Sequence, residues 1–454
     1  MKARRVAPPR PGLERFQAEK LQRFDAGWHS QTLSNGLRLL YHPNPESPEF
    51  YLGTVIQVGA RLENPKERGL SHFLEHMMFR GSKSYPSFLS LAEAFEWHGG
   101  EWNAATGYEH TEYWYSGIHS GAEDVVPLFA EFLQEPLLLD IDLERQVIVR
   151  EIEGELNEFG HSTDLDLHVA GEFWQGSALA DPIFGDQSIL ADLHLDHLKN
   201  HLRHYYYPEN MVVWVVGGAQ NKAILPAVER YFGAWQPNRQ LIQKPELVPV
   251  TPAQDGPHIK HVENSDNEFD IQLSFQTAGE WSEEVYAYEI ICRILSDGFC
   301  SRLVRRLREE EGLVYDIDAD ASQHYDVGTI DIDAAITPEK AEHFFQELFQ
   351  TLAKFVQDGP TEDEIKRAMI RSLVDLELAP AAPEEIATQL AWAQLTGHKT
   401  SLMADREAIL KLSADDICQY ARRIMRKENG TLIIFGPKNP GLVARAEELL
   451  RQYL

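Results

Sequence analysis

The sequence predicts an α+β fold built from two duplicated domains, each a mixed or antiparallel sheet with helices packed on it. Segments with strand and helix patterns alternate along the 454 residues, and the chain opens with a hairpin pattern. Two features of the first half, a strand that ends in Gly and a Glu-Asn pair before an apolar strand, recur in the second half at nearly the same spacing. This indicates an internal duplication. The chain is also longer than a usual single domain of roughly 100–200 residues.

The first half begins with a predicted β-hairpin that follows a lead-in at residues 1–24. Strand-like residues 32–34 and 37–41 flank the dipeptide Asn35-Gly36, which is typical of type I′ hairpin turns. Further strands are predicted at residues 51–59, 103–116 and 211–216, and helices at residues 69–80, 87–98, 125–134 and 142–159.

The second half repeats landmarks of the first. A predicted strand ends at Gly279 as an earlier strand ends at Gly59, an offset of 279 − 59 = 220. Near the end of each half, a Glu-Asn pair opens an apolar strand that ends in Gly, and the pairs at Glu209 and Glu428 differ by 428 − 209 = 219. Two domains of about 220 residues follow from these offsets. Their predicted bounds are residues 25–235 and 258–454, joined by a linker rich in Pro and Gln at residues 236–257.

The net charge of −29 argues against a nucleic-acid partner, because binding of phosphates needs clustered Lys and Arg. It permits a cationic peptide substrate, although a well-solvated acidic surface explains the charge equally simply.

Three cysteines at wide spacing form neither a disulfide framework nor a Cys-based zinc site. The basic N-terminus has no apolar core typical of a signal peptide, and the longest apolar run, at residues 211–216, is far short of the roughly 20 residues that span a bilayer. We therefore expect a cytoplasmic protein with no membrane partner.

A metal site is predicted at His72-Phe73-Leu74-Glu75-His76. On a helix, positions i, i+3 and i+4 share one face, so His72 and His76 can bind one ion while Glu75 lies beside them. Zinc suits two imidazole nitrogens and one carboxylate oxygen, although manganese or cobalt could use the same ligands. The alternative is a pair of solvated or core-capping histidines on an amphipathic helix.

The third ligand is left open by the pattern of residues. The acidic helix predicted at residues 142–159 carries Glu144, Glu151, Glu155 and Glu158 on one face. Periodicity does not choose between them, and a charged face turned to solvent is the alternative for the last two.

With these motifs, the chain resembles the pitrilysin/insulinase family of zinc metallopeptidases, the inverted zincins, which includes the mitochondrial processing peptidase and its bacterial relatives. The family pattern is HxxEH followed by a Glu about 74–76 residues beyond the second His. Here 151 − 76 = 75, so the resemblance selects Glu151 as the third ligand and places Glu144 as a residue that supports the site. It also implies a fold like that of the processing peptidase.

The resemblance extends to segments that bind substrate. Residues 99–106 look like the edge strand that pairs with the substrate backbone in the family, which implies substrate contacts at Asn103 and Ala104. Residues 301–303 and 308–315 look like a second signature, which implies that Arg308 and Tyr315 grip the substrate and stabilise the oxyanion. The positions that correspond to 72–76 in the second half are 292–296, which lack metal ligands, so we expect an inactive repeat there.

The resemblance implies a zinc-dependent endopeptidase with one Zn²⁺ per chain, in which Glu75 acts as the general base on a water molecule that the metal activates. Family members enclose unfolded peptides in a chamber of four such domains, so a homodimer is implied, with a heterodimer of a related subunit as an alternative. A further alternative is a non-catalytic scaffold or partner subunit. The physiological peptide is not readable from the sequence.

Overall fold

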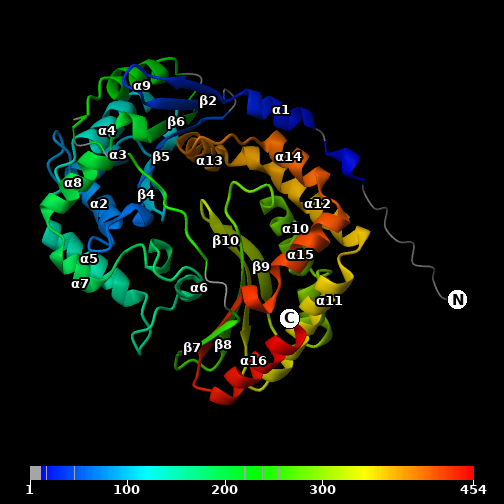
Figure 1. Cartoon of the computed structure of the whole chain (residues 1–454). Helices are drawn as coiled ribbons and strands as arrows, with labels where there is room; N and C mark the ends of the chain where they lie inside the picture. The colour runs from blue at the N-terminus through cyan, green and yellow to red at the C-terminus, as the bar shows by residue number, and fades with distance from the viewer. Residues whose placement is uncertain are drawn as a thin grey trace.

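Figure 1 shows the computed structural model, which describes residues 12–454 except 17, 45–46, 219–220, 238, 241, 243 and 253–255. The predicted lead-in and linker therefore lie partly outside the described residues. Two sheets occupy the two halves of the molecule, and helices surround them. The predicted α+β architecture with two sheets is confirmed.

The first sheet has six strands in the order β1-β2-β6-β3-β5-β4. Strands β2 and β6 are parallel, and the other neighbours are antiparallel. The predicted hairpin is confirmed, because β1 and β2 pair around a turn in which Gly36 has a φ of 93°, a conformation that glycine adopts without steric strain. The strands are β1 (His29–Thr32), β2 (Arg38–His42), β3 (Glu49–Ile56), β4 (Glu101–Thr106), β5 (Thr111–Ile118) and β6 (Met211–Gly217).

The helices of the first half include all four that the sequence predicts in this region. Their bounds are α1 (Ala18–Ala26), α2 (Leu70–Met78), α3 (Phe88–Glu96), α4 (Ala122–Gln134), α5 (Ile141–Gly154), α6 (Leu165–Phe173), α7 (Gln187–Asp192), α8 (Leu195–Tyr205) and α9 (Ile224–Gly233).

The helix predicted at residues 142–159 is shorter than expected, since α5 ends at Gly154. Glu155 caps this end, and its backbone N–H donates to the Glu151 carbonyl at 3.2 Å. Glu158 lies beyond the helix, where its carboxylate accepts a hydrogen bond from the backbone N–H of Ser265 at 2.7 Å. The prediction that Glu158 shares the helix face of Glu144 and Glu151 is therefore wrong, while Glu155 lies at the cap, one turn beyond Glu151.

The second sheet has five strands in the order β7-β11-β8-β10-β9. The strands are β7 (His258–Glu263), β8 (Phe269–Ala278), β9 (Ile317–Gln323), β10 (Val327–Ile336) and β11 (Gly430–Gly436). The helices are α10 (Val285–Leu295), α11 (Ala341–Asp358), α12 (Glu362–Leu378), α13 (Pro383–Thr396), α14 (Leu402–Lys411), α15 (Ala414–Ile424) and α16 (Pro440–Tyr453), with a π-helical segment, η5 (Val304–Glu310), before β9.

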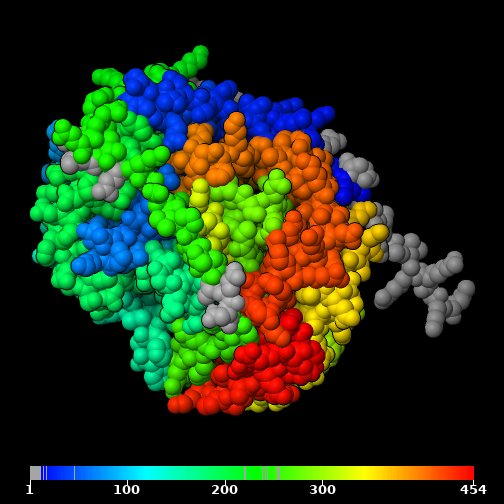
Figure 2. Space-filling model, viewed as in Figure 1, coloured from blue at the N-terminus to red at the C-terminus, as the bar shows by residue number. Residues whose placement is uncertain are grey.

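Each half contributes one helix that packs on the sheet of the other half. Helix α13 of the second half packs on β6 and β3 of the first sheet, where Trp392 and Ala391 join a buried cluster with Trp214. Helix α6 of the first half packs on β11 and β8 of the second sheet through Phe173 and its neighbours. In Figure 2 the orange surface of the α13 region lies directly against the blue N-terminal strands. Because each sheet is partly covered by a helix of the other half, the halves pack as one body.

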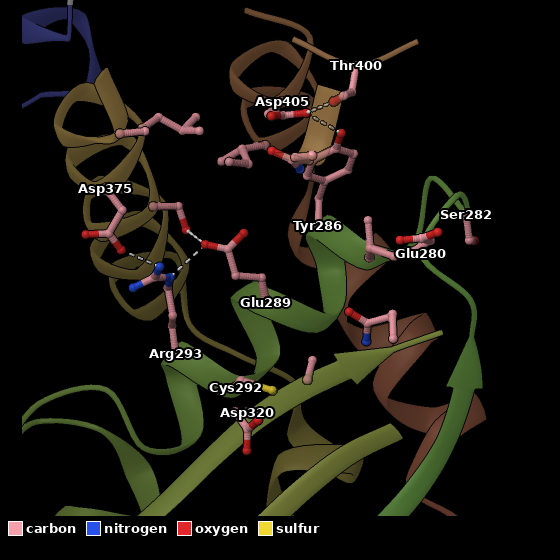
Figure 3. Close-up of a pocket in the computed structure, with 18 of the residues that line it drawn as sticks. Glu280, Ser282, Tyr286, Glu289, Cys292, Arg293, Asp320, Asp375, Thr400 and Asp405 are labelled. Carbon is pink, nitrogen blue, oxygen red and sulfur yellow. Dashed lines mark hydrogen bonds and ion pairs between the residues drawn. The ribbon is translucent and has the colours of Figure 1, made fainter. Parts of the chain in front are cut away.

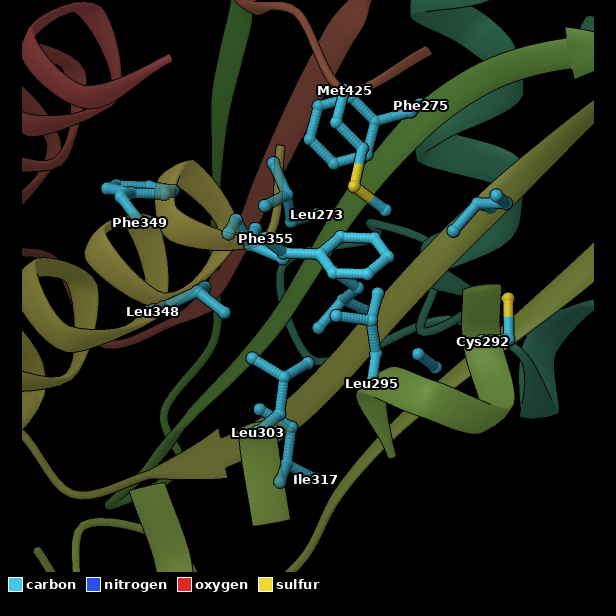
Figure 4. Packing of buried hydrophobic residues seen from close by; sticks show 14 of the residues in the cluster. Leu273, Phe275, Cys292, Leu295, Leu303, Ile317, Leu348, Phe349, Phe355 and Met425 are labelled. Atoms are coloured by element: carbon cyan, nitrogen blue, oxygen red, sulfur yellow. The ribbon is translucent and has the colours of Figure 1, made fainter. Parts of the chain in front are cut away.

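Each half has its own core between its sheet and its helices. Figure 4 shows the second core, in which Leu273 and Phe275 of β8 meet Leu295 of α10 and Phe355 of α11. Complete burial of each such side chain contributes roughly 1.5–3 kcal/mol to folding. Among the described residues, every helix is too short or too polar to cross a membrane.

Candidate metal site

Helix α2 carries the HxxEH motif, and its start is fixed by a buried carboxylate. Glu63 accepts hydrogen bonds from the backbone N–H groups of Gly69 and Ser71 at 2.8 and 2.6 Å. These N–H groups belong to the first turn, where no helical carbonyl can accept from them. Gly69 has a φ of 87°, and a Cβ there would lie 2.4 Å from the Phe184 carbonyl oxygen, so only glycine fits. Phe73 and the other apolar residues of α2 are buried, which turns the opposite face toward α5.

His72, His76 and Glu151 form a compact cluster. One potential ligand atom from each residue lies within 4.8 Å of the other two. The imidazole centroids are 4.7 Å apart, and His76 Nε2 lies 3.5 Å from Glu151 Oε2. Two imidazoles from one helix and a carboxylate from the next thus converge on one point.

The pKa values of the two histidines are shifted in opposite directions. Burial, with a smaller contribution from neighbouring His76, lowers the pKa of His72 to about 4, so its imidazole is neutral at pH 7. Burial also acts to lower the pKa of His76, but its hydrogen bond to Glu144 and the charges of Glu151 and Glu75 raise it above the usual value. His72 Nδ1 is buried without a hydrogen-bond partner among the described residues. An unpartnered imidazole nitrogen beside a second imidazole and a carboxylate fits a zinc ion.

Glu75 lies between the cluster and strand β4. The Thr106 hydroxyl donates to Glu75 Oε2 at 2.5 Å. Burial raises the pKa of Glu75, while the hydrogen bond from Thr106 lowers it in part. A carboxylate with a raised pKa, held by one donor, is suited to accept and return a proton.

Glu144 orients His76 through the imidazole nitrogen Nδ1. Its Oε2 lies 3.3 Å from His76 Nδ1, and its Oε1 lies 3.0 Å from Arg80 Nη1. Arg80 is fixed in turn by Asp140, at 2.9 Å. A carboxylate that accepts the Nδ1 proton leaves Nε2 of His76 free for a metal.

Strand β4 is an edge of the first sheet, because β5 is its neighbour on one side and no described strand pairs with it on the other. Asn103 is exposed and Ala104 half-buried on this strand. The Asn103 side chain accepts a hydrogen bond from the Ala104 backbone N–H at 2.9 Å. Contacts between α2 and β4 place this free edge beside the cluster.

Arg308 and Tyr315 do not join the cluster. The Arg308 guanidinium lies 5.5 Å from the ring centroids of both Phe299 and Tyr315, and Tyr315 is 88% exposed. Within the described part of the chain, no hydrogen bond, ion pair or ring contact links this pair to His72, Glu75, His76 or Glu151. The structure thus places the half-buried Arg308 and the exposed Tyr315 together, apart from the cluster.

The corresponding helix of the second half, α10, borders a cavity of about 1080 Å³ instead of a metal cluster. Figure 3 shows Arg293 of this helix paired with Glu289 and Asp375, below the Tyr286–Asp405 hydrogen bond. Cys292 lines this cavity at the position that corresponds to His72. The large cavity and the metal cluster therefore lie in different halves.

A second group of potential ligands, Glu311, His343 and Glu347, also occurs. The Arg306 guanidinium lies 2.8 Å from Glu311 and 2.7 Å from Glu347, so a cation of the protein already pairs with both carboxylates of this group. The contacts of Glu63 and of Thr106 with helix α2 were not predicted from the sequence. Thr106 lies 31 positions from Glu75, so only the fold brings the two together. Glu63 lies 6 and 8 positions before Gly69 and Ser71, and an acidic residue just ahead of a predicted helix is its sequence signal.

Family comparison identifies the class of protein. The model described as insulinase (peptidase family M16) matches residues 38–187, and that described as the peptidase M16 inactive domain matches residues 192–371. The chain therefore belongs to the M16 (insulinase) peptidase family. It is 27% identical to an uncharacterized zinc protease of Rickettsia bellii over 90% of this chain and 97% of that protein. It is 26% identical to the uncharacterized zinc protease YmxG of Bacillus subtilis over 74% of this chain and 80% of that protein.

Solved structures share the fold. A protease from Helicobacter pylori superimposes with a TM-score of 0.81 at 19% identity, over 90% of this chain and 99% of that chain. A peptidase M16 inactive domain from Pseudomonas fluorescens superimposes with a TM-score of 0.78 at 19% identity, over 91% and 98% of the two chains. These similarities confirm the architecture, while the chemistry is argued from the cluster itself.

Proposed function

We propose that the chain is a zinc-dependent endopeptidase that cleaves peptides or unfolded polypeptides. The observation that carries the proposal is the convergence of His72, His76 and Glu151 within 4.8 Å, with Glu75 beside them. The zinc protease names of the relatives support the metal and the reaction class.

A bound zinc ion would acidify a water molecule and polarise the carbonyl of the scissile bond. His72, His76 and Glu151 would hold the ion, and Glu144 would keep His76 oriented. Glu75 accepts a proton from the attacking water and later gives it to the leaving amine. Thr106 holds the carboxylate of Glu75 in place during both transfers.

The free edge of β4 provides the place for the substrate backbone. An extended peptide can add to such an edge as a further strand beside Asn103 and Ala104, with its main-chain groups paired to those N–H and C=O groups of β4 that point away from β5. Contact between α2 and β4 would then bring a peptide bond next to Glu75.

We propose further that two chains form the chamber and that Arg308 and Tyr315 act on the metal site of the other protomer. Support comes from the exposure of Tyr315 and from the lack of contact of both residues with the cluster of their own chain in the described structure. A heterodimer with a related subunit would use the same contacts.

The proposal is tested by incubating the protein with a pool of unfolded peptides and identifying products by mass spectrometry. Cleavage should stop with a chelator, return with zinc, and survive in Glu155→Gln. Glu155 is a matched control, because it lies one turn beyond Glu151 and is exposed outside the helix. No cleavage by the zinc-loaded protein would favour the non-catalytic alternative, whereas cleavage that persists without zinc would contradict the role of the metal.

A further inference from the structure

A buried ion triad joins two β-hairpin turns where the halves meet. Arg61 Nη1 lies 2.6 Å from Glu109 Oε1, in the turn between β4 and β5. It also lies 2.7 Å from Asp326 Oδ1, in the turn between β9 and β10. The Arg61 and Glu109 side chains are only 4% and 8% exposed, so their attraction is weakly screened by solvent.

Backbone hydrogen bonds extend the triad into both turns. The Tyr325 N–H donates to both carboxylate oxygens of Glu109, at 3.0 and 3.1 Å. The Arg61 N–H donates to the Tyr108 carbonyl at 2.7 Å, and Asp326 Oδ2 accepts from the Val250 N–H at 2.7 Å. The turn of the first half is thus attached to the turn of the second half through side chains of both.

Each turn also packs tightly against a glycine of its own half. A Cβ at Gly59 would lie 2.3 Å from the Gly107 carbonyl oxygen, and a Cβ at Gly279 would lie 2.5 Å from the backbone of Asp326. Gly59 and Gly279 are the two glycines whose offset of 220 residues indicates the duplication. Each turn is therefore held close to its own sheet, and the triad bridges the two turns.

The first turn leads directly to the proposed catalytic base. Thr106 is the last residue of β4, three positions before Glu109, and its hydroxyl donates to Glu75. A shift of the turn would move this hydroxyl and the free edge of β4 together.

We propose that Asp326, in the half without the predicted metal ligands, is a positioning residue for the reaction at the metal site. Through Arg61 and Glu109 it fixes the β4–β5 turn, and with it Thr106 against Glu75. The catalytic consequence rests on the proposed peptidase function, whereas the link between the two turns stands on the geometry alone. The second half thereby supports the catalytic base of its own chain.

Amide hydrogen exchange of the full-length protein tests the link without any need for activity. In Asp326→Ala, the amides of Ala60, Arg61 and Gly107 should exchange roughly tenfold faster, because their hydrogen bonds hold or close the first turn. The amides of the core strand β8 should exchange as slowly as in the unaltered protein. Asp326→Asn should show a smaller change, since it keeps an acceptor of the same size while losing the charge, and it carries the test if the Ala variant does not fold.

Glu364→Gln is the matched control. It removes the charge of another half-buried ion pair of the second half, with Arg302 at 2.8 Å, and contacts neither turn. Exchange at Arg61 and Gly107 should be unchanged in this variant.

Kinetics test the catalytic consequence. In Asp326→Ala, kcat should fall roughly tenfold with unchanged zinc content, because a displacement of a catalytic group by about 1 Å can slow a reaction up to about 100-fold. Unaltered exchange at the first turn in folded Asp326→Ala would overturn the proposal. Faster exchange there with an unaltered kcat would overturn the role in positioning. If the unaltered, zinc-loaded protein cleaves no peptide, the proposed function is wrong. Amide exchange in Asp326→Ala then still tests the link between the two turns.

Discussion

Glu75 is the residue whose replacement has the clearest expected effect. In Glu75→Gln, the side chain keeps its size and can still meet Thr106, but it can no longer accept a proton. Loss of a general base lowers kcat/KM by about 10²–10⁴-fold. Initial rates on one cleaved peptide measure this, with zinc content as the control, which should match that of the unaltered protein. Activity within a few-fold of normal would show that another group is the base.

Thr106 controls the ionisation of that base. Burial raises the pKa of Glu75, and the hydrogen bond from Thr106 acts in the opposite direction. Thr106→Val removes the donor at nearly constant volume, so the pKa of Glu75 should rise further. Because the ionised carboxylate is the active form, the acidic limb of kcat/KM should move to higher pH. A limb that stays in place, or moves to lower pH, would contradict this role.

At the residue scale, the sequence predicts the metal ligands in part. Helical spacing brings His72 and His76 together, and the structure agrees. Periodicity left the third ligand open, and only the family resemblance selected Glu151. Glu155 lies outside the cluster of His72, His76 and Glu151, at the cap that ends α5, and periodicity does not show this cap. The contact between Thr106 and Glu75 joins residues 31 positions apart and follows only from the fold.

The start of helix α2 is the element on which the metal cluster depends. Glu63 accepts from two N–H groups of its first turn, so Glu63→Ala leaves two buried donors without a partner. Each such loss costs about 1–3 kcal/mol of unfolding free energy. Urea unfolding of the metal-free protein measures this. Glu63→Gln keeps one oxygen acceptor and should be milder, so equal losses in the two variants would contradict the capping role.

At the scale of elements, the sequence pattern does not predict which sheet a helix packs against, as α6 and α13 show. The strands of the first half and the turn at Gly36 follow from local residue types. The partner of a helix does not, because an apolar face predicts burial without saying against which sheet. Helices α6 and α13 each cover the sheet of the opposite half, a contact that the predicted domain bounds of 25–235 and 258–454 do not include.

At the scale of the whole molecule, completion of the site between two chains can be tested with a mixed dimer. One chain carries Arg308→Ala and the other His76→Ala. If Arg308 and Tyr315 act on the partner, one site carries both lesions and the other is intact, so half-normal activity is expected. Sites completed within one chain would each carry a lesion, and total inactivity would contradict the proposal. The dimer itself and the cytoplasmic location stay predictions.

Metal content per chain is the direct test of whether His72, His76 and Glu151 hold zinc. Mass spectrometry of the purified protein beside His76→Ala is the measurement. We expect close to one zinc per chain, lost in the variant. No metal in the unaltered protein, even after zinc is supplied, would rule out this metal site and leave a non-catalytic scaffold as the better description.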